Sequence, residues 1–247
     1  MQVPVLFWVL GATVLDGLLA FAGIFTLKMK EKEVRQIIKG LIAFSAGALL
    51  AGAFFHLLAE SLEEMQSQEA FFLLFTGFIL FFLIERFLHW HHCHEGHCEV
   101  HPMSYLIIIG DSVHNFIDGL IIAASFVAGI PFGILTTVLI IGHELPQELG
   151  NFGIMVHGGI EKKKALLYNF IAQATAVIGG LAGYFFSLNA GSVSFLLPFA
   201  AGGFIYISAS DLIPELHKEK NLSKSLFSFA LFLFGILFMA GLKILLE

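Results

Sequence analysis

The sequence predicts an all-α integral membrane protein with eight transmembrane helices, folded as a single domain over residues 1–247. Apolar residues make up 57% of the chain and charged residues 13%, whereas soluble domains carry about 25% charged residues. Stretches of about 20 apolar residues, the length that crosses the hydrocarbon of a bilayer, recur along the whole chain. Lys and Arg residues gather in alternate connections between these stretches, which is the pattern of cytoplasmic loops.

Short connections separate the predicted spans, so consecutive helices are expected to pack as antiparallel neighbours. The first stretch has no basic segment before it and contains Asp16, which favours a membrane span over a cleaved signal peptide. The predicted spans cover residues 4–27, 36–60, 69–90, 104–128, 131–157, 163–187, 194–214 and 222–246.

The basic residues predict the orientation. Of the 13 Lys and Arg residues, all except Lys243 lie in or beside the connections that follow the first, third, fifth and seventh spans. Basic residues are retained on the cytoplasmic side, so both termini are expected outside. With a net charge of −6, nothing in the chain is basic enough to suggest a nucleic-acid partner.

Polar side chains interrupt the fourth and fifth spans near their centres. Ionisable groups inside a bilayer cost about 2.5–3.5 kcal/mol each on insertion scales, so they persist where they face partners or water. Residues four apart share one face of a helix, which pairs His114 with Asp118 and His143 with Gln147. The fourth span contains Asp111, His114, Asn115 and Asp118, and the fifth contains His143, Glu144, Gln147, Glu148 and Asn151.

The two histidines are expected at nearly the same depth, on helices joined by a tight turn. With the carboxylates of Asp118, Glu144 and Glu148 they would form one site near the midplane. Imidazole nitrogen and carboxylate oxygen suit Zn²⁺, and also Fe²⁺ or Mn²⁺. Pro146 lacks an N–H, so the helix is expected to kink and the carbonyl of Gly142 needs a partner from outside its own helix.

Two motifs resemble those of the ZIP (Zrt/Irt-like) metal transporters. His114-Asn115-Phe116-Ile117-Asp118-Gly119 resembles the family's HNFxDG, and residues 143–150, HELPQELG, resemble HEIPHELG, the signature of one branch. GALLAGAFFHLLAE, ending at Glu60, is similar to the family's second span. AAGGFIYISASDLIPEL, starting at Ala200, is similar to its seventh.

The resemblance implies inverted repeats around spans four and five, with both termini outside. It implies a homodimer in the plasma or inner membrane that carries Zn²⁺, or Fe²⁺, Mn²⁺ or Cd²⁺, towards the cytoplasm. Two transported ions would bind between the central spans, without an organic cofactor. Carried over by position, the first ion would be held by His114, Asp118, His143 and Gln147, and the second by Asn115, Asp118, Glu144, Gln147 and Gln173.

Three positions depart from the family pattern. Gln147 stands where this branch usually has His, Gln173 where Glu occurs, and Asn151 where Asp is common. A glutamine amide is a weak, neutral ligand, so the second site is expected to be weaker or absent.

Polar residues also mark the two ends of the expected path. His56 and Glu60 lie four apart near the outer end of the second span and are interpreted as an entrance, because acidic funnels concentrate cations. Asp111, Asp211 and Glu215 lie on the inner side and are interpreted as an exit.

The connection over residues 89–103 is rich in metal-binding side chains. Its irregular spacing does not match a closed structural zinc site, and in a reducing cytoplasm its thiols remain available as soft ligands. We expect it to bind metal on the cytoplasmic side through His89, His91, His92, Cys93, His94, His97, Cys98 and His101.

Two other functions are compatible with a metal site in the membrane. An intramembrane zinc metalloprotease uses HExxH, but Gln147 replaces its second histidine and Pro146 interrupts the turn, so an enzyme is not expected. A metal-gated channel or sensor needs the same polar path as a carrier, and the sequence leaves that alternative open.

Overall fold

The computed structural model describes residues 3–26, 31–90, 100–157, 160–190 and 195–246. The regular structure in these ranges is helical, which confirms the all-α prediction. The helices are α1 (Val3–Gly17), η1 (Leu18–Phe21), α2 (Gly23–Thr26), α3 (Glu31–Ala51), η2 (Gly52–Leu58), α4 (Ala59–Glu64), α5 (Ser67–Trp90), α6 (Val100–Ala128), α7 (Ile130–His157), α8 (Lys162–Gln173), α9 (Thr175–Ala190), α10 (Leu196–Tyr206), η3 (Ile207–Leu212), α11 (Ile213–His217) and α12 (Leu222–Leu246).

Six helical segments among the described residues are long and apolar enough to cross a membrane, which indicates a multi-pass membrane protein. They are Val5–Phe25, Gln36–Glu64, Ser67–Ile84, Lys162–Ser187, Leu196–His217 and Leu222–Ile244. The other two predicted spans correspond to α6 and α7, which are 29 and 28 residues long and carry the central polar residues. The count of eight spans stays a prediction.

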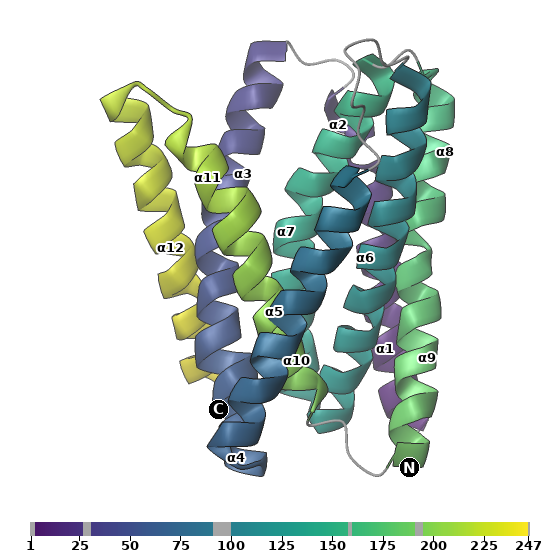
Figure 1. The fold of residues 1–247 in the computed structure, drawn as a ribbon, viewed down its shortest axis with the longest axis vertical. Helices are drawn as coiled ribbons and strands as arrows, with labels where there is room; N and C mark the ends of the chain where they lie inside the picture. Colours follow the sequence, from purple (N-terminus) through teal and green to yellow (C-terminus); the bar gives the residue numbers. More distant parts are fainter. Residues whose placement is uncertain (1–2, 27–30, 91–99, 158–159, 191–194, 247) are drawn as a thin grey trace.

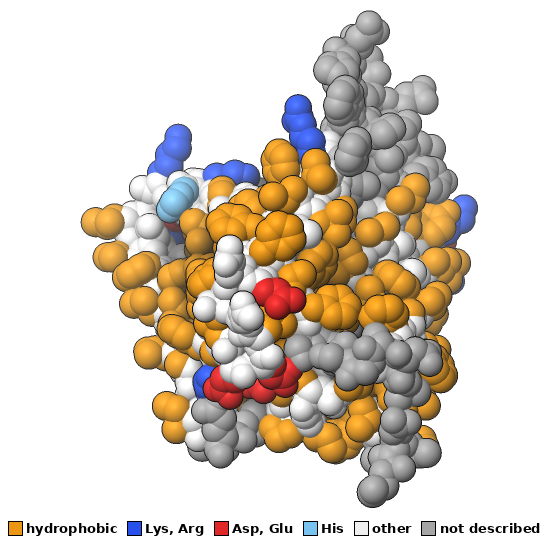
Figure 2. Space-filling model, turned by 60° about the horizontal axis from the view of Figure 1, so that its bottom comes forward, with side chains coloured by type: hydrophobic (Ala, Val, Ile, Leu, Met, Phe, Trp, Pro, Cys, Tyr) orange, Lys and Arg blue, Asp and Glu red, His pale blue; other side chains and the backbone are white. Residues whose placement is uncertain are grey.

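Successive long helices run in opposite directions, and both chain ends lie at the end of the bundle where α4 meets α5 (Figure 1). We call this the terminal end. The opposite end, where α2, α5, α7 and α11 end, we call the basic end. Figure 2 shows acidic side chains grouped on the face towards the terminal end, with Lys and Arg side chains standing mainly at the far edge. The side of the membrane that each end faces stays a prediction.

The helices form two groups that lie side by side in Figure 1. In the first, which we call the α6–α7 group, α6 packs against α1, α7, α8 and α9. In the second, the α3–α12 group, α3 packs against α12 and α5 packs against α10. The groups meet where α3 contacts α7 and where α10 contacts α6.

Reciprocal glycines bring three helix pairs into backbone contact. A Cβ at Gly119 of α6 would lie 2.0 Å from the carbonyl oxygen of Ala176, and one at Gly179 of α9 would lie 2.0 Å from that of Phe116. No side chain fits at such a distance, so these positions require glycine for close approach. The same arrangement joins α3 to α12 through Gly47 and Gly235, and α5 to α10 through Gly77 and Gly202.

Two π-helical turns interrupt the second and seventh predicted spans at equivalent places. η2 begins five residues after Gly47, and η3 begins five residues after Gly202. By the same offset His56 corresponds to Asp211, and Glu60 corresponds to Glu215. α3 and α10 run in opposite directions (Figure 1), and the inverted repeat itself stays a prediction.

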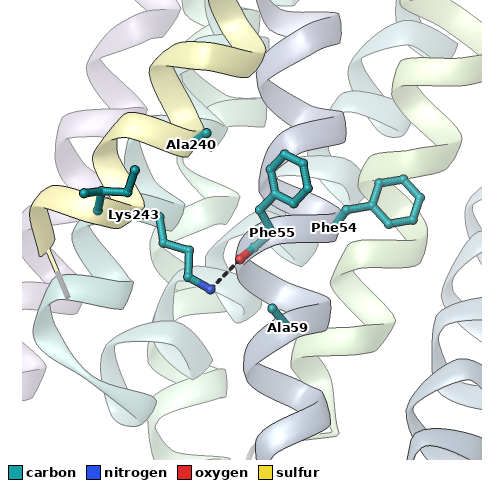
Figure 3. A pocket seen from close by; sticks show the side chains of 6 residues that line it. Phe54, Phe55, Ala59, Ala240 and Lys243 are labelled. Atoms are coloured by element: carbon teal, nitrogen blue, oxygen red, sulfur yellow. Dashed lines mark hydrogen bonds between the residues drawn. The ribbon is translucent and has the colours of Figure 1, made fainter.

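Lys243, the one basic residue outside the predicted charge pattern, has a local structural role. Its Nζ donates a hydrogen bond of 2.8 Å to the carbonyl oxygen of Phe55, inside η2 (Figure 3). A π-helical turn disturbs the regular bonding of its carbonyls, so this lysine satisfies one of them. The surrounding pocket, lined by Phe54, Ala59 and Ala240, lies between η2, α4 and α12.

Candidate metal site

Four side chains from α6 and α7 converge on one point in the bundle. His114 and Asp118 come from α6, where their spacing of four places them on one face. His143 and Glu144 come from α7. Each contributes one ligand atom, and these atoms all lie within 4.8 Å of one another.

The separations between these atoms suit a tetrahedral ion. The Nε2 atoms of His114 and His143 are 3.2 Å apart. Glu144 Oε1 lies 3.2 Å from His114 Nε2 and 3.5 Å from His143 Nε2. Asp118 Oδ2 lies 3.2 Å from His143 Nε2 and 3.6 Å from His114 Nε2. Bond lengths of about 2.0–2.1 Å place the ligands of tetrahedral zinc roughly 3.3–3.4 Å apart, so the spacing agrees with a zinc cradle.

Burial leaves the acidic groups of the site in need of a cation. The side chains of Asp118 and Glu144 are 0% exposed, and that of His114 is 15% exposed. Among the described residues, Asp118 Oδ2 and Glu144 Oε1 find no donor besides the two histidine nitrogens, and Asp118 Oδ1 finds none. Buried carboxylates are costly unless a positive charge lies among them, so a cation bound between the carboxylates and the imidazoles would stabilise this arrangement.

The ring of His143 is oriented by its own helix. Its Nδ1 lies 3.2 Å from the carbonyl oxygen of Leu139. A hydrogen bond from Nδ1–H to a carbonyl leaves Nε2 as the lone-pair nitrogen, which is the usual arrangement behind a metal-binding histidine.

The α3–α12 group supplies the wall of the site. Phe81 of α5 packs edge-on against His114, with ring centroids 6.1 Å apart, and Phe204 of α10 packs against His143 at 5.7 Å. The Ser45 hydroxyl of α3 donates to the carbonyl of Gly142, the group that Pro146 leaves without a helical partner. The predicted need for an outside partner is thereby confirmed, and α7 continues as one helix through the proline.

Three amides beside the site bond to Asp111. The Gln147 Nε2 atom donates to Asp111 Oδ1 at 2.9 Å, and the Asn151 amide donates to the same oxygen at 2.8 Å. The resemblance assigned Gln147 to the first ion, but the structure places Glu144 beside both histidines. Asn115 is fully buried and donates to the backbone carbonyl of Asp111 at 2.9 Å.

Gln173 connects the site to α1. Its Nε2 lies 3.4 Å from Glu144 Oε2 and 3.4 Å from Asp16 Oδ2. Asp16 was not assigned a role from the sequence, because a single carboxylate in a span has no partner with a recognisable spacing. Glu148 joins Asp111 and Glu144 in a second acidic cluster, whose ligand atoms lie within 4.8 Å of one another.

Asp111, predicted as an exit residue, lies beside Glu144 in this acidic cluster. The other predicted entrance and exit residues lie on η2, α4, η3 and α11. His56 is 4% exposed, and its Nε2 lies 3.0 Å from the carbonyl oxygen of Met239. Glu60 is partly exposed and Asp211 is exposed. Glu215 forms an ion pair with Lys218 at the surface. Most of the histidine- and cysteine-rich connection, residues 91–99, lies outside the described residues, as do the side chains of His89 and His101.

Comparison with known proteins identifies the family. The family model described as "ZIP Zinc transporter" matches residues 5–102 and 90–243. "Zinc transporter zipt-7.2" of Caenorhabditis elegans is 39% identical over 145 residues, covering 55% of this chain and 30% of the relative. "Zinc transporter ZIP10" of Homo sapiens is 35% identical over 141 residues, or 51% of this chain and 17% of the relative.

A longer match extends over most of the chain. "Zinc transporter ZIP13" of Pongo abelii is 31% identical over 221 residues, covering 82% of this chain and 66% of the relative. The chain therefore spans less than a third of the first two relatives and about two thirds of this one. The ZIP family consists of transporters, which confirms that the chain is not an enzyme. On the match across nearly its whole length, the chain belongs to the ZIP zinc transporter family.

Proposed function

We propose that this chain carries Zn²⁺ across a membrane, binding it at His114, Asp118, His143 and Glu144 on the way. The observation that carries the proposal is the set of four nitrogen and oxygen atoms within 4.8 Å of one another, in which the five separations that involve a histidine nitrogen are 3.2–3.6 Å. Nitrogen and carboxylate ligands of this kind suit Zn²⁺, and also Fe²⁺, Mn²⁺ and Cd²⁺. The names of the relatives favour zinc.

The direction of transport that we propose is from the terminal end to the basic end, and so into the cytoplasm. It rests on the retention of basic loops on the cytoplasmic side, with α6 and α7 counted as membrane spans. His56 and Glu60 would attract the ion at the outer end, and Asp211 and Glu215 would release it at the inner end. The histidine- and cysteine-rich connection would then receive it. A homodimer in the plasma or inner membrane completes the proposal.

Alternating access would use the boundary between the two helix groups. All four ligands belong to the α6–α7 group, whereas Phe81 and Phe204, which cover the histidine rings, belong to the α3–α12 group. If one group rocked against the other, the aromatic rings would move away from the ion while its four ligands kept their positions relative to one another. Such movement of one bundle against another around a fixed site is common in transporters.

Zinc uptake into proteoliposomes tests the proposal. The wild type is expected to take up zinc with saturation, and the double variant His114→Ala/His143→Ala should lose uptake. Thr76→Ala is a control, because Thr76 is exposed and bonds only within its own helix, to the carbonyl of Phe72. Equal uptake by the wild type and the double variant would end the proposal. Uptake that rises linearly with zinc concentration, at the rates of a pore, would indicate a channel instead of a carrier.

A further inference from the structure

A second group of buried acids lies beside the histidine site. Asp111 of α6 and Glu144 and Glu148 of α7 each place a carboxylate oxygen within 4.8 Å of the others. Glu144 and Glu148 are 0% exposed and Asp111 is 6% exposed. This is not the set that the family resemblance implies for a second ion, which contains three amides and lacks both Asp111 and Glu148.

The charge of this group is not balanced by its hydrogen bonds. Neutral amides donate to Asp111 from Gln147 and Asn151, and to Glu144 from Gln173. Both carboxylate oxygens of Glu148 are buried and find no hydrogen-bond donor among the described residues. Like charges this close in a low-dielectric interior repel one another strongly, so a cation among the three carboxylates would stabilise them.

The backbone of Glu148 is fixed by a side chain of α8. The Asn169 amide of α8 donates to the carbonyl oxygen of Glu148 at 3.2 Å. Asp111 is oriented by its two amide donors, at 2.9 and 2.8 Å. The carboxylates of Asp111 and Glu144 are therefore oriented by amides on α7 and α8, as the ligands of a built site are, and the backbone of Glu148 is fixed by α8.

The three carboxylates lie about one helical turn nearer the basic end than the histidine site. Asp111 precedes His114 by three residues on α6, which runs from the basic end, and this is about 4.5 Å of helix rise. Glu148 follows Glu144 by four residues on α7, which runs towards the basic end, and this is about 6 Å. Glu144 belongs to both sets, with Oε1 facing the histidines.

We propose that Asp111, Glu144 and Glu148 form a second, oxygen-only site for the transported divalent ion, which receives it from the histidine site through the shared carboxylate of Glu144. The inference deepens the proposed function and rests on it. Loss of imidazole ligands weakens the hold on a borderline ion such as Zn²⁺, while oxygen ligands retain hard divalent ions. The second site would therefore bind zinc more weakly, which favours release towards the basic end.

Cadmium binding to the purified full chain separates the two sites without a transport assay. ¹¹³Cd NMR distinguishes ions bound by oxygen alone from those with nitrogen or thiolate ligands, so ions on the cysteine-containing connection are recognised by their own signal. We expect the wild type to give both a nitrogen-containing and an oxygen-only signal. Glu148→Gln and, separately, Asp111→Asn should lose only the oxygen-only signal, with one bound Cd²⁺ fewer per chain. His143→Ala should lose the nitrogen-containing signal.

Glu161→Gln is the matched control, because Glu161 is exposed beside the start of α8 and its loss of charge should change neither signal. An oxygen-only signal that survives in both Glu148→Gln and Asp111→Asn would overturn the inference while leaving the histidine site intact. The same holds if the wild type shows no oxygen-only signal. Retention of every signal in His143→Ala would instead contradict the proposed function, so the two failures are distinguishable.

Discussion

The two helix groups use the same device for packing but differ in what they bury. Reciprocal glycines join α6 to α9 in one group, and α3 to α12 and α5 to α10 in the other. The α6–α7 group alone supplies the residues of the two metal-ligand clusters found among the described residues. The α3–α12 group contributes aromatic rings and the Ser45 hydroxyl at the boundary. The proposed alternating access depends on this difference, with the ligands on one group and the covering rings on the other.

The largest effect should come from removing a ligand. His143→Ala should weaken zinc binding by more than the roughly 10–100-fold that changes behind the ligands cost, because it removes one corner of the tetrahedron. Phe204→Leu, in the wall, should change zinc affinity less than tenfold. Isothermal titration calorimetry with zinc measures the affinity of both variants. A larger loss in Phe204→Leu than in His143→Ala would show that the wall, not the α6–α7 group, holds the ion.

The next effect concerns the close helix pairs. Gly119→Ala places a Cβ 2.0 Å from the carbonyl oxygen of Ala176, and overpacking of this kind costs about 1–3 kcal/mol. Thermal unfolding in detergent should show the loss. Gly11→Ala is the control, since nothing lies within 4 Å of its Cβ, and it should leave the stability unchanged or slightly raised. Equal melting temperatures for the two variants would mean that α6 and α9 separate at little cost.

A smaller effect is expected at the boundary between the groups. Ser45→Ala leaves the carbonyl of Gly142 without its donor, and an unsatisfied buried polar group costs about 1–3 kcal/mol, less where water can reach it. The unfolding temperature should fall, while Thr76→Ala should leave it unchanged. Zinc affinity should be retained, because Ser45 is not a ligand. A loss of affinity without a loss of stability would place Ser45 in the site itself.

The smallest effect concerns an exposed pair within the α3–α12 group. The backbone N–H of Asn221 and the Lys39 ammonium, 3.0 Å away, lower the pKa of the Glu219 carboxyl. A lowered pKa in the folded state adds stability above the usual glutamate pKa, and this contribution is lost as the pH falls through the lowered value. Glu219→Gln should therefore reduce the melting temperature slightly at pH 7, with the difference vanishing in acid. A difference that grows in acid would contradict the assigned partners.

Much of the site could be predicted from residue spacing. His114 and Asp118 were paired because they lie four apart on one helix, and the structure brings them to a common point with His143. Glu144 was also expected in the midplane site, but the spacing of four paired His143 with Gln147, whereas the structure puts Glu144 beside the histidines. Neighbours on a helix are about 100° apart, so both reach a seam that lies between them. Spacing alone does not locate that seam.

The sequence by itself determined that the chain is helical and that it lies in a membrane. It also determined which predicted spans contain ionisable residues. These properties follow from composition and from local periodicity, which need no partner. Only the tertiary structure decided that Gln147 binds Asp111, that Gln173 links Glu144 to Asp16, and that Glu148 completes a separate acidic cluster. Contacts between helices depend on their rotation and crossing, which the packing of glycine against backbone sets and no single helix encodes.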